Sequence, residues 1–300
     1  MNLRQLTYFV RIAQTGSFNG AADTLHVAQS ALSRHMKDLE EELGGALLDR
    51  GPHGVTLSDS GEVLFDRAKF ILSQLEEARS EVLAHNRELM GFVRLMTPSS
   101  IGQLLFEPLV DRFLGQFPKV RLELTEGLWN DAENRLRTGA VDVAVMSGAW
   151  KSDYIELEPL ALEQMILIGG AGDPLIRAKS IALDDLAGLA LMMPEMSLER
   201  IRSIAPRLFT KLDVRIFVES APAIRALVAA GHGYGVVPNS VLLGTLESRK
   251  LAGVSIRDFE VLRQLGTLRG RPKGRAVREL VAVIRSEFEG LILAGLMRRP

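Results

Sequence analysis

Cysteine is absent from the 300 residues of this chain. A chain without thiols forms no disulfide, holds no metal through thiolates and has no cysteine nucleophile. Apolar runs of about eighteen residues or more are absent as well, and no charged and then apolar leader with a cleavage site begins the chain. These absences predict a cytoplasmic protein that has no membrane-spanning helix and is not exported.

A general positive charge is also missing. The chain has 36 Lys and Arg residues against 37 Asp and Glu residues, and the first ninety residues hold nine of the former against thirteen of the latter. Proteins that bind nucleic acid through a broad basic field have the opposite balance. Contact with nucleic acid would therefore depend on a few locally placed cations and on duplication of the site in an oligomer. We expect nonspecific affinity to be weak and sensitive to salt.

The rest of the composition is that of a globular protein. Hydrophobic residues make up 47% of the chain and charged residues 24%, which is enough apolar material for sizeable cores. A length of 300 residues exceeds that of a typical single domain. The chain is therefore expected to divide into two or three domains.

Residues 17–43 carry two amphipathic helical patterns separated by a very short turn. The first begins at Ser17, a good N-cap, and its apolar residues follow at helical spacing. The second has an apolar stripe formed by Leu32, Met36, Leu39 and Leu43. Its opposite face carries Gln29, Ser33 and Lys37 at steps of four, flanked by Ser30 and Arg34.

The polar face of this second helix has the chemistry of a major-groove reader. Glutamine pairs with adenine, arginine with guanine and serine with either. Cations lie in the first half of the helix and acidic residues in the second, as expected of a helix that enters the groove by its N-terminal end. An ordinary helical hairpin with a solvated face has the same pattern, so it stays an alternative at this point.

The order of residue types over Met1–Gly61 indicates the protein's function more specifically than the helical pattern of residues 17–43 does. The residues that carry the likeness are Leu6-Thr7-Tyr8-Phe9-Val10, Gly16-Ser17-Phe18, Ala21-Ala22, Leu25-His26-Val27-Ala28-Gln29-Ser30-Ala31-Leu32-Ser33-Arg34, Leu39-Glu40-Glu41-Glu42-Leu43-Gly44 and Leu57-Ser58-Asp59-Ser60-Gly61. In this order they resemble the LysR-type transcriptional regulators, nearly position for position. Met1–Leu6 and Leu25–Gln29 are similar to the nitrogen-assimilation-control branch of that family. Ser30 stands where family members commonly have proline, which predicts a looser helix start and an altered base preference.

The resemblance implies an all-α winged helix-turn-helix domain over residues 1–58. It assigns contacts with double-stranded DNA to Gln29, Ser30, Ser33, Arg34 and Lys37. Leu47–Arg50 and Val55–Leu57 have the pattern of two short strands that form the wing. Arg50 and His53 are the candidates there for the phosphate backbone or the minor groove. Histidine is largely uncharged near neutral pH, so His53 is expected to contribute less.

Residues 59–90 are expected to form a long linker helix. Asp59 and Glu62 open a helical pattern whose positions from Leu64 to Leu89 alternate steps of four and three residues, with His85 as the polar exception. A helix packed on its own domain is the alternative. The resemblance implies instead that two linker helices pair antiparallel in a homodimer or homotetramer. Half-sites on DNA would then lie one helical turn or a multiple apart.

From Gly91 onward, strands and helices alternate. The expected strands are Val93–Met96, Arg121–Thr125, Val141–Met146, Met165–Ile168, Ala190–Met193, Val214–Val218, Gly235–Val237 and Leu262–Leu268, and the expected helices lie near 102–116, 130–138, 198–210, 222–230 and 274–294. This alternation is typical of a doubly wound α/β fold with mostly parallel sheets.

The resemblance implies that residues 91–300 form a two-lobed α/β effector domain similar to the periplasmic binding proteins. Lobe I would comprise residues 91–161 and 267–300, and lobe II residues 162–266. The chain would cross between the lobes near Leu160–Leu162 and near Leu265–Thr267, with the effector in the cleft.

Polar residues at strand ends mark the expected effector cleft. Ser99 and Ser100 follow the first strand and open a helix, while Ser147 and Ser220 follow other strands. For Ser99 and Ser100 a simple helix cap is the alternative role, and Trp129 is a candidate for the cleft and equally a packing residue. Together these residues predict a site for a small effector that is anionic or polar.

Motifs of enzymes and of cofactor sites are missing. Gly231–Val236 has a glycine spacing close to a dinucleotide fingerprint, but it follows a helix and enters a strand, the reverse of the required order. No nucleophile elbow, P-loop or zinc-protease motif occurs, and the five histidines are scattered. We therefore expect no catalytic residue, no cofactor and no metal site.

The combined features predict a ligand-responsive transcription regulator. Its expected partners are double-stranded DNA, a small effector and further copies of the chain, with RNA polymerase as an additional candidate. The alternative is an α/β enzyme or a solute-binding module with a helical N-terminal appendage.

Overall fold

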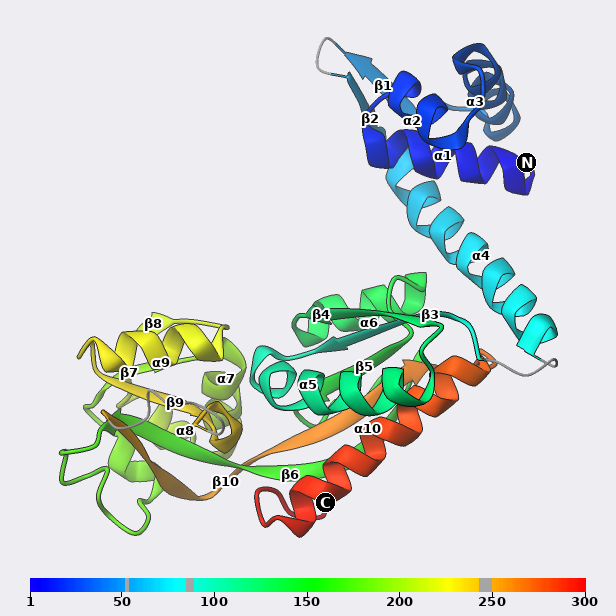
Figure 1. Cartoon of the computed structure of the whole chain (residues 1–300). Coiled ribbons are helices and arrows are strands. Elements are labelled where there is room, and N and C mark those ends of the chain that lie inside the picture. Colours follow the sequence, from blue (N-terminus) through cyan, green and yellow to red (C-terminus); the bar gives the residue numbers. More distant parts are fainter. Residues whose placement is uncertain (52–53, 85–88, 243–249) are drawn as a thin grey trace.

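Three helices and a two-stranded hairpin fold around one apolar core at the N-terminal end of the chain (Figure 1). In this computed structural model, residues 1–51, 54–84, 89–242 and 250–300 are described. The elements of the first domain are α1 (Leu3–Thr15), α2 (Phe18–Leu25), α3 (Gln29–Leu43), β1 (Leu48–Gly51) and β2 (Gly54–Leu57). The antiparallel pairing of β1 with β2 confirms the predicted hairpin.

Local capping explains where these helices begin and end. The Asn2 side chain accepts a hydrogen bond from the backbone N–H of Gln5, whose own side chain accepts from the Asn2 N–H, so α1 starts with a capping box. Ser17 caps α2, as predicted, by accepting from the N–H of Gly20 at 3.3 Å. Gly16 and Gly44 end α1 and α3 in the left-handed conformation that glycine adopts without strain.

Helix α4 (Asp59–Ala84) leaves this domain but its first turns are part of the domain core. Phe65 packs edge-on against Phe9, with 6.4 Å between ring centroids. Ala68 is fully buried, and Leu64 is packed against the same core. Leu64 and Ala68 are the first two positions of the apolar seam, the pattern of alternating steps of four and three residues expected from Leu64 to Leu89. Both pack inside this chain, because the short helices α1–α3 cannot enclose their core without α4.

The later seam positions differ. Ile71 and Leu75 are 37% and 44% exposed, so an apolar strip continues along α4 without cover from the described chain. His85 lies outside the described residues. Leu89, expected on the same seam, is instead buried in the core of the following domain, because the chain has already reached that domain two residues before β3.

One eight-stranded sheet runs through the α/β domain in the order β4-β3-β5-β10-β6-β9-β7-β8. Its strands are β3 (Gly91–Thr97), β4 (Val120–Glu126), β5 (Val143–Ser147), β6 (Ile155–Gly170), β7 (Ala190–Met193), β8 (Asp213–Phe217), β9 (Tyr234–Pro238) and β10 (Leu251–Leu268). Strands β3–β5 are parallel to one another, as are β7–β9. The long strands β6 and β10 pair antiparallel and join the two halves, so the sheet is mixed.

Helices cover both faces of each half of the sheet (Figure 1). They are α5 (Ser99–Gln116), α6 (Trp129–Thr138), α7 (Glu195–Ile204), α8 (Pro206–Phe209), α9 (Ala221–Ala229) and α10 (Arg275–Leu293), with the short 3₁₀ helices η1 (Leu183–Leu186) and η2 (Asn239–Leu242). In the first half, α5 and α10 share one core and α6 packs on the opposite face. In the second half, α7 and α8 cover one face and α9 the other.

The two long strands change from one core to the other along their length. On β6, Ala161 belongs to the core of the first half and Met165 to that of the second. On β10, Val261 belongs to the second half and Leu265 to the first. The crossing expected at 160–162 remains a prediction that these contacts support, while core membership on β10 favours a crossing a few residues before 265–267.

Several predicted elements differ from the observed ones. The helix expected over 198–210 begins at Glu195 and breaks at Pro206, which starts the separate helix α8. Strands β6 and β10 extend well beyond the segments Met165–Ile168 and Leu262–Leu268. Gly231 and Gly233 have positive φ in the turn between α9 and β9, which agrees with the interpretation of this run as a helix stop and turn.

Candidate DNA-binding surface and effector cleft

Helix α3 has one fully buried face and one polar face. Leu32, Met36 and Leu39 are 0% exposed, and burial of each side chain stabilises the domain by about 1.5–3 kcal/mol. This anchoring turns the opposite face outward. There Gln29, Ser30, Arg34 and Lys37 are exposed and Ser33 is half-buried.

The hydrogen bond and the ion pair on the polar face of α3 do not involve Arg34. The Gln29 amide donates to the Ser33 hydroxyl at 3.0 Å, and Lys37 forms an exposed ion pair with Glu41 at 3.5 Å. Within the described residues, Arg34 has neither a hydrogen bond nor an ion pair through its side chain. An exposed guanidinium without an internal partner loses no contact when it moves onto a base edge or a phosphate.

The hairpin formed by β1 and β2 places a further cation beside α2. The Arg50 guanidinium lies 4.4 Å from the centroid of the Phe18 ring, a cation–π contact that joins the wing to α2 near its turn. His53, the other predicted wing contact, lies outside the described residues.

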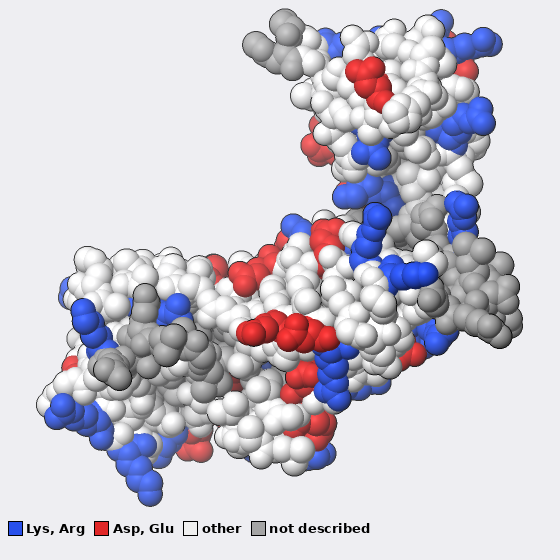
Figure 2. All heavy atoms as spheres, viewed as in Figure 1, with Lys and Arg blue, Asp and Glu red and all other residues white. Residues whose placement is uncertain are grey.

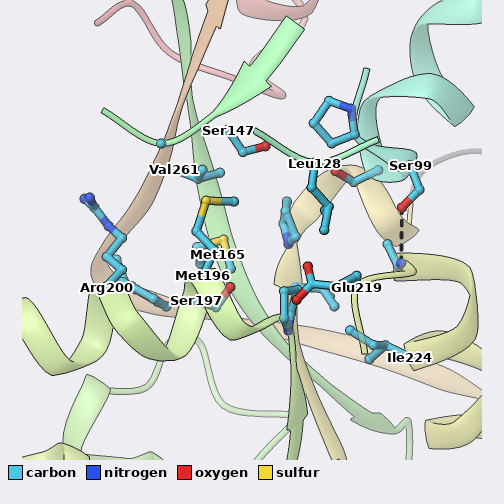
Figure 3. Close-up of a pocket in the computed structure, with 18 residues that line it drawn as sticks. Ser99, Leu128, Ser147, Met165, Met196, Ser197, Arg200, Glu219, Ile224 and Val261 are labelled. Carbon is cyan, nitrogen blue, oxygen red and sulfur yellow. Dashed lines mark hydrogen bonds between the residues drawn. The ribbon is translucent and has the colours of Figure 1, made fainter. Parts of the chain in front are cut away.

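A cavity of about 80 Å³ lies between the two halves of the α/β domain (Figure 3). The starts of α5, α7 and α9 all reach it, and Ser99, Ser100 and Ser147 line it as predicted. Most other lining residues are apolar: Leu128, Met165, Met196, Ile224, Val237, Phe259 and Val261. Ser220 and Trp129 are not among the lining residues.

Two of the lining serines are held by a buried ion pair. Arg263 and Glu163 are both 0% exposed, and the Arg263 Nε donates to the Glu163 carboxylate at 2.8 Å. The Arg263 guanidinium also donates to the hydroxyls of Ser100, at 3.3 Å, and Ser147. The second Glu163 oxygen accepts from the backbone N–H of Ser240 at 2.7 Å. The network thus connects elements of both halves directly beneath the cleft.

Ser99 links the two halves across the cleft. Its hydroxyl accepts a hydrogen bond from the backbone N–H of Ala221, at the start of α9, at 3.3 Å (Figure 3). Ser220 instead caps α9 by accepting from the N–H of Ala223 at 3.4 Å. Of the predicted serines, Ser99 therefore has a direct hydrogen bond from one half of the domain to the other.

Trp129 takes part in packing beside the cleft. Its ring stacks on that of Trp150, with centroids 4.7 Å apart and planes at 7°. Trp150 donates from its indole nitrogen to the Ser147 carbonyl at 2.6 Å. The pair therefore supports the strand end that carries Ser147, which is the packing role left open for Trp129.

Charged residues that the sequence analysis did not single out also border the cleft. The Nε atom of Arg200 is buried and has no hydrogen-bond partner within the described chain. Glu219 accepts from the backbone N–H of Glu195, at the start of α7, at 2.9 Å. Outside the cavity lining, a hydrogen bond from Arg298 lowers the pKa of Glu260, and Arg200 adds a smaller attraction.

The sequence contains one indication of the buried ion pair between Glu163 and Arg263. Glu163 and Arg263 are charged residues that each follow an apolar residue at the place where the chain crosses between lobes. A charge inside an apolar strand needs a partner. Their separation of 100 residues gives no local spacing by which to match them.

Neither a membrane span nor a metal cluster is found among the described residues. No helix there combines the length and apolarity needed to cross a bilayer. No group of three or more His, Asp or Glu side chains in the same part of the chain is arranged to hold a metal ion.

An outward polar recognition helix, a long connecting helix and a two-lobed domain with a cleft define a ligand-responsive DNA-binding regulator. Residues 3–62 match the bacterial regulatory helix-turn-helix protein, LysR family, and residues 86–289 match the LysR substrate binding domain. The chain belongs to the LysR family of transcription regulators and is not an enzyme. The predicted family and fold class are thereby confirmed.

Relatives and solved structures agree with this assignment. The nitrogen assimilation regulatory protein of Klebsiella aerogenes is 32% identical over 80% of this chain and 79% of its own length. The regulator CysL of Bacillus subtilis is 26% identical over 87% of this chain and 88% of its own. A full-length OxyR variant of Pseudomonas aeruginosa has a TM-score of 0.72 and 25% identity, covering 95% of this chain and 98% of that one. CbnR complexed with its target DNA has a TM-score of 0.72 at 23% identity, covering 96% and 100%, which shows the shared fold.

Proposed function

We propose that α3 enters the major groove of an operator, with Gln29, Ser33 and Arg34 toward the base edges. Ser30, Lys37 and Arg50 position the domain on the phosphates, with His53 in the wing as a further contact. The observation that carries this proposal is the division of α3 into a fully buried face and an exposed polar face. Since the domain has no general positive charge, specificity depends on these few contacts and on a second copy.

The exposed strip on α4 supports an oligomer. Ile71 and Leu75 continue the apolar seam beyond the turns that close the domain core. Antiparallel pairing of two such helices would cover them and set two recognition helices apart, in a homodimer or a tetramer of two dimers. The proposal includes the domain limits 1–58, 59–90 and 91–300, a cytoplasmic location beside chromosomal DNA, and contact with RNA polymerase.

We expect the full-length protein to retard DNA from the promoter region beside its own gene in a gel. Retention should fall steeply as salt increases, because each neutralised phosphate releases a counterion. Unrelated DNA of equal length is the control and should be retained far more weakly. Equal retention of both fragments at every salt concentration contradicts sequence-specific binding.

The cleft supports a small effector with an apolar body and one anionic or polar group. Methionine, isoleucine, valine and phenylalanine side chains supply the apolar wall, while Arg200 and the starts of α5, α7 and α9 supply polar partners. The cavity of about 80 Å³ is well below the roughly 300–1,000 Å³ typical of ligand pockets. The lobes must therefore separate to admit the effector, and a ligand that prefers one lobe arrangement shifts the population toward it.

Replacement of Ser99 by alanine is expected to leave DNA affinity unchanged and to weaken effector affinity at least about tenfold, since a hydrogen bond to a charged group contributes roughly 1.5–3 kcal/mol. The effector is first identified as the compound that most raises the melting temperature of the full-length protein in a panel of carboxylic acids. Ser220→Ala is the matched control, because Ser220 caps α9 outside the cavity lining. Unchanged affinity in Ser99→Ala, or equal losses in both variants, contradicts the assigned contact.

A further inference from the structure

A second cavity lies between the DNA-binding domain and the α/β domain. Its volume is about 810 Å³, and it is lined by α1, α4, β3, β4 and the start of α10. This volume lies within the range of small-molecule sites without any movement of the domains. The effector cleft, at about 80 Å³, does not.

The lining of this second cavity is strongly basic. Among the described residues, seven cations contribute to it, namely Arg11, Lys69, Arg94, Lys119, Arg121, Arg271 and Arg275, against a single carboxylate, that of Asp142. Figure 2 shows Lys and Arg side chains gathered where the N-terminal domain and α4 meet the α/β domain. Such a concentration is unusual in a chain whose net charge is −1.

The one carboxylate of the lining is already shared, and Arg94 also lies 3.9 Å from the Glu123 carboxylate outside the lining. Asp142 is buried and lies 3.6 Å from Arg94 and 3.4 Å from Arg271. In the described part of the chain, Arg11, Arg121 and Arg275 have no ion pair or hydrogen bond through their side chains. Positive charges that are grouped in this way, as those of Arg11, Arg121 and Arg275 are, repel one another, and a bound anion relieves that repulsion.

Two further features of the lining suit an organic anion. Helix α10 begins at this cavity without an acidic residue in its first turn or a side-chain cap, so its positive end adds to the field. Phe92 and Met90 line the cavity and are 43% and 48% exposed. These side chains offer an apolar surface on which the body of a ligand can pack.

We propose that this cavity binds a small phosphorylated metabolite carrying at least two negative charges. A DNA duplex is too wide for a cavity of this volume. The ligand would contact Arg11 of α1 and Arg121 and Arg275 of the α/β domain, and would thereby hold the DNA-binding domain at one angle to lobe I. That consequence rests on the proposed function, whereas the binding itself does not.

Calorimetric titration of the full-length protein with pyrophosphate and with ATP, both without divalent metal, tests the proposal. The double variant Arg121→Gln/Arg275→Gln should weaken both probes by at least about tenfold, because charge-assisted contacts are lost. The control Arg207→Gln/Lys211→Gln removes the same charge from lobe II. All four side chains are exposed, so both variants should fold. The control should change affinity less than about twofold, as screened surface charges do.

Two results would overturn the site: no saturable binding of either probe, or equal weakening in both double variants. A third would do so as well: neither probe binds, and the variant Arg121→Gln/Arg275→Gln no longer forms the tetramer that the wild type forms. The last result would mean that a second copy of the chain occupies the cavity. Operator retardation, measured on the same preparations, distinguishes these failures from a failure of the regulatory assignment, since the proposed site is not required for α3 to reach DNA.

Discussion

Replacement of Arg34 by alanine is expected to abolish specific operator binding while the protein stays folded. A good bidentate base contact is worth about 1–3 kcal/mol of discrimination. A dimer loses the contact twice, so the expected loss is about 2–6 kcal/mol, or between about thirtyfold and more than ten-thousandfold. The fold should be unaffected, because Arg34 is exposed and its side chain has no hydrogen bond or ion pair with the described chain.

Gel retardation of operator and unrelated DNA measures this loss, and circular dichroism checks the fold. Arg4→Ala is a matched control that removes the same charge from the same domain, at an exposed position on α1. If Arg34→Ala retains the wild-type ratio of operator to unrelated DNA affinity, α3 does not read bases through this residue. Equal losses in both variants would indicate a general charge effect.

Replacement of Glu163 by leucine is expected to destabilise the α/β domain by about 3–5 kcal/mol, because removal of one partner leaves the buried charge of the other uncompensated. Arg263 would keep only the hydroxyls of Ser100 and Ser147, and the Ser240 N–H would lose its acceptor. The corresponding drop in melting temperature is about 6–20 °C for a domain of this size.

The double variant Glu163→Leu/Arg263→Met should recover most of this loss, since replacing both members of a buried pair with apolar residues is often neutral. Urea unfolding followed by the fluorescence of Trp129 and Trp150, which stack in the first half of the α/β domain, reports the free energy of unfolding of each variant. A double variant no more stable than Glu163→Leu would show that the network is needed for more than charge compensation.

Local signals in the sequence were sufficient for the DNA-binding domain. The predicted cap at Ser17 involves residues within a few positions of one another, as do the observed cap at Asn2 and the stop at Gly44. The apolar stripe of α3 follows from helical periodicity alone, except that Leu43 is 46% exposed at the helix end. Short-range physics also placed Ser99, Ser100 and Ser147 at strand ends, which the fold brings to the cleft.

Long-range contacts could not be predicted in the same way. The hydrogen bond between Ser99 and Ala221 joins positions 122 residues apart, and no spacing in the sequence links them. Likewise, the periodicity of the seam predicts an apolar face on the helix but does not specify which surface covers that face. The same pattern therefore runs from Ala68, in the core of the first domain, to Leu89, in the core of the second.

The irregularity in β10 has a consequence for motion. Between Ser255 and Glu260 the pairing with β6 shifts register, and the Gln164 side chain donates to the carbonyls of Ile256 and Phe259, which the shift leaves outside the ladder. Between these two ladder pairs, β10 therefore contains more residues than β6 does. We expect lobe II to rotate about β6, with the extra residues of β10 accommodating the movement, so that Phe259, which lines the cleft, moves with every change of lobe angle.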